Sequence, residues 1–139
     1  MNDLLFDSSV WIDYFRKIES PQTDLLHTAL LSDWTVWHCP TIRQEVLQGV
    51  KLPEELSRVQ DNFDFLERLE VDPYLMADKA ARIYRFLRKQ GVTIRKPNDC
   101  LIAAYAIQFN LKVVHSDVDF DRIAQYSLDQ DGILQIWSE

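Results

Sequence analysis

The fold is decided by a short stretch, LLFDSSVWID, which covers residues 4–13. Three apolar residues are followed by a polar turn and a new periodic segment, a pattern typical of a short buried strand that feeds a helix. Asp7 then stands at the carboxyl end of that strand, where open parallel sheets form ligand crevices. Two interpretations stay open here: Asp7 or Ser8 is the N-cap of the following helix, or Asp7 is a functional carboxylate.

Strands and helices alternate along the rest of the chain. The apolar patterns predict further strands at residues 35–39, 111–115 and 133–137. They predict helices at residues 9–16, 23–31, 41–48, 54–69, 74–90, 97–107 and 119–126. This order predicts an α/β fold with a mostly parallel central sheet and helices on its faces, a three-layer α/β/α arrangement.

Two of these helices carry informative details. The helix at 41–48 has a capping-box pattern, with Thr41 as N-cap and Gln44 three residues later, and Gly49 as its stop. The helix that begins at Pro97–Asp99 is apolar nearly all round through Ile107, so it must be buried.

The composition bounds the class of protein. Of the 139 residues, 47% are hydrophobic and 27% charged, as in ordinary globular proteins, and we expect one domain over residues 1–139. No apolar stretch approaches the roughly 18 residues of a membrane span, and the N-terminus lacks the features of a signal peptide. Cys39 and Cys100 are too few for a disulfide framework, so we expect reduced core thiols and a cytoplasmic protein.

Four acids stand out by position. Asp7 and Asp117 each end a predicted strand, Asp99 opens the most buried helix, and Glu45 flanks the inward face of another. If the two strands are parallel, both of their carboxylates point into one crevice, and Asp99 can face the same place. Taken singly, each acid also has an ordinary interpretation: a favourable helix-dipole charge for Asp99, a turn residue for Asp117, and an exposed helix residue for Glu45.

Gathered carboxylates need a cation. Two charges about 4 Å apart repel by roughly 4 kcal/mol at an effective dielectric of 20. Oxygen ligands without histidine or thiolate favour Mg²⁺ or Mn²⁺, and such ions activate water and stabilise a phosphodiester during hydrolysis. The formal net charge of −7 argues against broad duplex binding, but it does not exclude a nucleic-acid enzyme whose acids hold metal.

The ordered set of motifs resembles a known family. It comprises DSSVWI at residues 7–12, Glu45 in a short helix, Asp99 before an Ile-Ala-Ala helix, and SDVDF at residues 116–120. Together they resemble a PIN domain, most closely the VapC-type toxins of bacterial toxin–antitoxin pairs. The resemblance covers essentially the whole chain and implies a PIN-like fold and metal-dependent endoribonuclease activity.

The resemblance also implies roles for single residues. Asp7, Asp99 and Asp117 match the acids that hold Mg²⁺ or Mn²⁺, and Glu45 matches a further ligand or the residue that orients the attacking water. Three auxiliary residues match as well: Ser9, which helps orient the first Asp, Ser116, which stands where Thr is common, and Asp119, a frequent auxiliary acid. The implied partners are RNA, a cognate antitoxin whose tail occupies the acidic crevice, and a second copy in a homodimer.

Basic residues offer a path for an RNA backbone. Arg82 and Arg85 recur at helical spacing, and Arg95 and Lys96 precede Asp99. A solvated helix face is the favoured interpretation of the first pair, and both interpretations stay open for the second pair.

Two other functions compete with a nuclease. A haloacid-dehalogenase-type phosphohydrolase would use Asp7 as nucleophile, but that chemistry normally has a second acid two residues later, where this chain has Ser9. A non-catalytic PIN-like binding module would keep the fold and act as a scaffold for partners.

Overall fold

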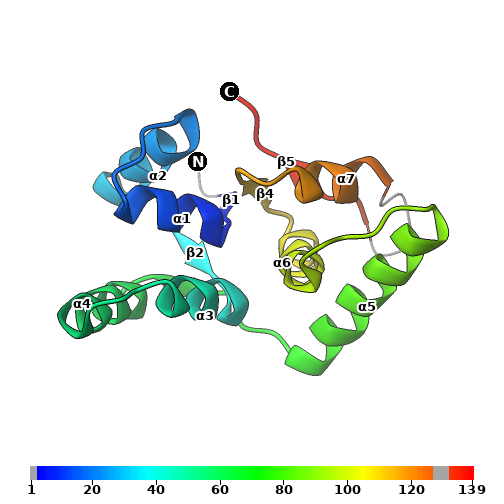
Figure 1. The fold of residues 1–139 in the computed structure, drawn as a ribbon, viewed down its shortest axis with the longest axis horizontal. Coiled ribbons are helices and arrows are strands. Elements are labelled where there is room, and N and C mark those ends of the chain that lie inside the picture. The colour runs from blue at the N-terminus through cyan, green and yellow to red at the C-terminus, as the bar shows by residue number, and fades with distance from the viewer. Residues whose placement is uncertain (1–2, 127–131) are drawn as a thin grey trace.

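The computed structural model describes residues 3–126 and 132–139 (Figure 1). In chain order the elements are β1 Leu4–Phe6, α1 Ser8–Phe15, α2 Pro21–Leu31, β2 Trp37–His38, α3 Pro40–Gln48, α4 Pro53–Asp64, β3 Glu67–Arg68, α5 Pro73–Lys89, α6 Pro97–Gln108, β4 Lys112–Val114, α7 Val118–Tyr126 and β5 Gln135–Ile136.

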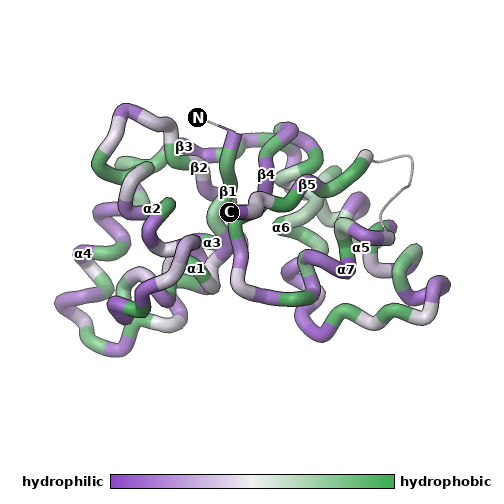
Figure 2. Tube along the Cα trace, turned by 90° about the horizontal axis from the view of Figure 1, so that it is seen from above, coloured by the Kyte–Doolittle hydropathy of each residue, from purple (hydrophilic) through white to green (hydrophobic). Residues whose placement is uncertain are grey.

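All strands of the sheet run parallel, in the order β3-β2-β1-β4-β5. The central strand β1 pairs with β2 at Leu5 and Trp37, and with β4 along its whole length. Figures 1 and 2 show α1–α4 to one side of the central strands and α5–α7 to the other. The predicted three-layer α/β/α fold is confirmed.

The core lies where the central strands meet helix α6. Leu5 and Val113, opposite each other on β1 and β4, are fully buried, and so are Ile102 and Ala106 on α6. Helix α6 packs against α3, α5 and α7, so most of its surface is buried. The prediction of a helix that is apolar all round, and therefore buried, is confirmed.

Both cysteines lie in this core. Cys39 and Cys100 are buried free thiols, and burial raises the pKa of each to about 12, so they stay protonated. This agrees with the prediction of unpaired core thiols. Within the described residues, no helix has the length and apolar character needed to cross a bilayer.

Each of the five prolines begins a helix, at the starts of α2, α3, α4, α5 and α6. Proline suits the first helical position because its φ is already helical and its missing N–H costs nothing there. The predicted capping box at Thr41 is therefore wrong: α3 begins at Pro40, Cys39 is its N-cap, and Thr41 is already inside the helix. Gly49 ends α3 as predicted.

The predicted helix at 54–69 is also wrong at its C-terminal end. Helix α4 ends at Asp64, and Glu67–Arg68 form the edge strand β3, which was not predicted. The backbone N–H groups of Glu67 and Leu69 donate to Val36 O and His38 O on either side. The open edge of β2 thus draws these residues out of the helix, a tertiary effect that helical spacing of Phe63 and Leu66 conceals.

We predict that Leu5→Ala lowers the free energy of unfolding by about 2–5 kcal/mol, because the substitution leaves a cavity at the centre of the sheet. The matched control is Leu31→Ala, at a residue of α2 that is 76% exposed, which changes it by at most about 0.5 kcal/mol. Urea unfolding of the two variants measures both. Equal losses at the two positions would contradict this account of the core.

Candidate active site

Asp7 lies at the turn from β1 into α1 and is 3% exposed. It is the N-cap of α1: its Oδ2 accepts from Ser9 N at 3.1 Å and from Ser9 Oγ at 2.6 Å. Its Oδ1 has no hydrogen-bond partner among the described residues. The N-cap interpretation of Asp7 is therefore confirmed, and its other oxygen is free of protein donors in the described part of the chain.

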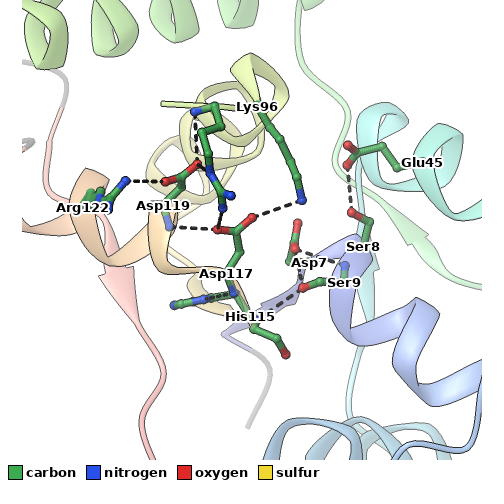
Figure 3. Close-up of polar contacts among 11 residues, drawn as sticks. Asp7, Ser8, Ser9, Glu45, Lys96, His115, Asp117, Asp119 and Arg122 are labelled. Atoms are coloured by element: carbon green, nitrogen blue, oxygen red, sulfur yellow. Dashed lines mark hydrogen bonds and ion pairs between the residues drawn. The ribbon is translucent and has the colours of Figure 1, made fainter. Parts of the chain in front are cut away.

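Asp117 occupies the equivalent place after β4. Its Oδ1 accepts from Asp119 N at 3.0 Å, at the start of α7, and its Oδ2 accepts from Lys96 Nζ at 3.2 Å. β1 and β4 are parallel neighbours, and two bonds join the turns that follow them: Asp7 N donates to Val114 O at 2.9 Å, and Ser116 N donates to Ser9 Oγ at 3.3 Å. The two acids therefore open on the same end of the sheet (Figure 3).

Asp99 lies in the first turn of α6 and is 3% exposed, with Oδ2 unpartnered among the described residues. Burial is the main reason that its pKa rises to about 8, and the negative charges of Asp7, Asp117 and Glu45 raise it further. Burial raises the pKa of Asp7 as well, against the opposing bonds from Ser9. The carboxyl group of Asp99 thus lies close enough to each of the other three predicted acids for their charges to raise its pKa.

Glu45 reaches the site from α3. Its Oε1 accepts from Ser8 Oγ at 2.9 Å, and Figure 3 shows this pair beside Asp7. Ser8 was not predicted as a site residue, although its place between Asp7 and Ser9 was a signal. His115 also contributes to the site, since its Nδ1 accepts from Asp117 N at 3.0 Å and so helps shape the turn.

Asp119 is fully buried and already bonded on both oxygens. Its Oδ2 accepts from Arg95 N at 3.2 Å, and its Oδ1 accepts from Arg122 Nη1 at 3.2 Å. One oxygen each of Asp99, Asp117 and Asp119 lie within 4.8 Å of one another. Because its oxygens hold these two donors, Asp119 anchors the segment that leads into α6.

The basic residues divide into two groups. Arg95 lies 3.6 Å from Asp117 Oδ1 and 3.6 Å from Asp119 Oδ2, and Lys96 reaches Asp117 directly. Arg82 and Arg85 instead lie exposed on α5, an element that carries none of the predicted acids. The structure therefore brings Arg95 and Lys96 to the acidic site.

The donor set suits a divalent cation. It consists of carboxylate oxygens, two of them, Asp7 Oδ1 and Asp99 Oδ2, buried without a hydrogen-bond partner in the described part of the chain. A buried polar atom without a partner is costly, and a bound cation is one partner that satisfies such an oxygen. The acids present can therefore hold a metal ion.

The raised pKa of Asp99 predicts how the free energy of unfolding depends on pH when metal is chelated. Its pKa is about 8 in the folded protein and near 3.8 when unfolded, so between these values the folded state binds more protons. The free energy of unfolding should therefore fall as pH rises from about 4 to 8. Asp99→Asn should flatten this fall, as measured by urea unfolding in EDTA at several pH values. An identical pH profile for wild type and variant would contradict the raised pKa.

Comparison with known proteins identifies the fold and the family. The model of the PIN domain matches residues 4–126. Over 123 residues the chain is 36% identical to the VapC ribonuclease Mb1587 of Mycobacterium bovis and to ribonuclease VapC11 of Mycobacterium tuberculosis, covering 88% of this chain and 92% of each relative.

Solved structures agree on the fold. The VapBC-1 structure from nontypeable Haemophilus influenzae matches with a TM-score of 0.68 and 20% identity, over 98% of each chain. VapBC2 from Rickettsia felis, bound to a DNA fragment from its promoter, matches with a TM-score of 0.66 and 18% identity, over 97% of this chain and 98% of that one. With the family model covering most of the sequence, the chain belongs to the PIN-domain family.

Proposed function

We propose that this protein is a metal-dependent endoribonuclease of the VapC type, with Asp7, Glu45, Asp99 and Asp117 as its acidic site. The observation that carries the proposal is that Asp99 on α6 feels the charges of Asp7 after β1, Glu45 on α3 and Asp117 after β4. In addition, Asp7 Oδ1 and Asp99 Oδ2 are buried without a hydrogen-bond partner among the described residues. The relatives named VapC ribonucleases, 36% identical over nearly their whole length, support the same activity.

Mg²⁺ or Mn²⁺ is the ion that these ligands favour, because both are hard cations that prefer oxygen. Asp7, Asp99 and Asp117 would hold it, and such an ion activates water for attack on a phosphodiester. Glu45, kept in place by Ser8, serves as a further ligand or orients the attacking water.

The surrounding residues have supporting roles. Ser9 fixes the rotamer of Asp7 through a 2.6 Å bond, and Ser116 N ties the turn after β4 to Ser9 Oγ. Asp119 anchors the backbone of Arg95. Arg95 and Lys96, which lie at Asp117, can meet the phosphates of single-stranded RNA, and Arg82 and Arg85 on α5 are further candidates for RNA contact.

The partners follow from the relatives. Solved neighbours of this fold are VapBC complexes, so we propose a cognate antitoxin for this protein. A homodimer, a single-domain organisation and a cytoplasmic location complete the proposal.

The activity is tested with purified protein and total RNA in Mg²⁺ or Mn²⁺. We expect cleavage that EDTA abolishes, and a loss of more than about 100-fold in Asp7→Asn and Asp99→Asn, beyond the roughly 10–100-fold typical of outer-shell changes. Ser9→Ala, which frees the Asp7 rotamer, should lose about 10–100-fold. The matched control is Asp61→Asn, an exposed acid on α4, with unchanged cleavage.

Other outcomes separate the competing functions. Cleavage that survives both Asp7→Asn and Asp99→Asn would contradict the proposed roles. A covalent phosphate trapped on Asp7 would indicate a haloacid-dehalogenase-type phosphohydrolase. A folded protein that neither binds Mn²⁺ nor cuts RNA would be a non-catalytic binding module.

We predict that the protein forms a complex with the product of the neighbouring gene, and that this complex cuts RNA more slowly than the free protein. Size-exclusion chromatography with light scattering, on the protein alone and after co-expression, measures the masses. If the protein without a partner has the mass of a dimer, this would support the homodimer. Masses that stay separate at micromolar concentration would count against an antitoxin encoded there.

A further inference from the structure

Lys96 enters the acidic site from its rim. Its Nζ donates to Asp117 Oδ2 at 3.2 Å, and Figure 3 shows the side chain extended toward Asp117 and Asp7. The hydrogen bond that Lys96 donates to Asp117 raises the pKa of Lys96, and the negative charges of Asp117, Asp99 and Asp7 raise it further. One ammonium group therefore sits in the field of three acids that are proposed to hold a divalent ion.

Lys96 has the mobility to leave this position. Its side chain is 59% exposed, whereas Asp117 beside it is 8% exposed. Its neighbour Arg95 is held through its backbone, by the bond from Arg95 N to the fully buried Asp119. The segment is thus fixed at its backbone, while the flexible stem of Lys96 can swing toward solvent.

The other basic groups near the site donate no hydrogen bond to Asp117 within the described residues. Arg95 keeps 3.6 Å from both Asp117 and Asp119 and is 67% exposed, and Arg122 binds Asp119 on the far side from Asp7. Among the described residues, Lys96 is the cation whose hydrogen bond ends on one of the proposed ligand acids.

We propose that Lys96 is a built-in counter-ion that occupies the acidic site in the absence of metal and must leave Asp117 when a divalent cation binds. This inference rests on the proposed function, because it takes Asp117 as a ligand. It makes Lys96 a positioning residue that sets the metal concentration at which the site fills. A divalent ion and the ammonium repel each other and share one carboxylate, so they compete.

The test is calorimetric titration of Mn²⁺ into wild type and Lys96→Met, which keeps the apolar stem and removes the charge. We expect Lys96→Met to bind Mn²⁺ about three- to tenfold more tightly, a modest gain because Lys96 is partly solvated. Lys51→Met, at an exposed lysine after α3, is the matched control and should bind as wild type does.

Thermal melting gives an independent readout. In EDTA, Lys96→Met should melt below wild type, because its carboxylates lack their counter-ion; saturating Mn²⁺ should close or reverse that difference. Lys51→Met should show no such dependence on Mn²⁺. A purely structural Lys96 would lower both melting temperatures equally and leave the affinity for Mn²⁺ unchanged or weaker, which would overturn the proposal.

The outcomes distinguish this inference from the proposed function. Mn²⁺ binding to wild type with no gain in Lys96→Met contradicts the counter-ion alone. No Mn²⁺ binding in either protein contradicts the metal site itself, whereas binding that appears only in Lys96→Met supports the competition.

A labelling experiment on wild type keeps the proposal testable if Lys96→Met does not fold. Reductive methylation with formaldehyde, read by mass spectrometry, should modify Lys96 faster relative to Lys51 once Mn²⁺ is added. An unchanged ratio would show that Lys96 stays in place, against the proposal.

Discussion

Carboxylates buried side by side repel one another, and the organisation of this site follows from that repulsion. Asp99 and Asp7 have raised pKa values because burial and neighbouring charge disfavour their ionised forms. Burial raises the pKa of Asp117, but the backbone N–H of Asp119 and the positive side chains of Lys96 and Arg95 lower it by more, so its pKa is lowered overall. Without metal, a proton on Asp99 and the ammonium group of Lys96 beside Asp117 both reduce the repulsion among the acids. A divalent ion bound at the proposed site would replace both and neutralise the acids together.

The same residues that build the site also build the fold. Asp7 caps α1 with one oxygen, and Asp117 accepts from the first turn of α7 with one of its own. Helix capping and cation binding draw on different oxygens of the same carboxylate, so one side chain serves both. Because the helices that follow β1 and β4 fix these rotamers, the acids are preorganised at the carboxyl ends of two adjacent parallel strands, where α/β sheets place their ligands.

The cationic segment before α6 is tied to the acids by the buried Asp119. Its carboxylate accepts from Arg95 N and from Arg122 on α7, so the segment is joined to the element that follows Asp117. Asp119 resembles a ligand by position and by proximity to Asp99, yet its bonds are those of an anchor. The buried carboxylate of Asp119 thus fixes the position of the basic segment at the rim of the site.

The sequence by itself determined the alternation of strands and helices, the buried α6 and the acids at strand ends, because local periodicity and strand–turn–helix signals are written in neighbouring residues. It also suggested which four acids belong together, but only as a set of positions. The tertiary structure alone decided three things. The open edge of β2 pairs with Glu67–Arg68, which therefore form a strand and not the end of a helix. Ser8 bonds to Glu45, 37 residues away. Lys96 bonds to Asp117 and does not belong to a fully solvated surface. Each depends on contacts between residues far apart in the chain, which no local pattern encodes.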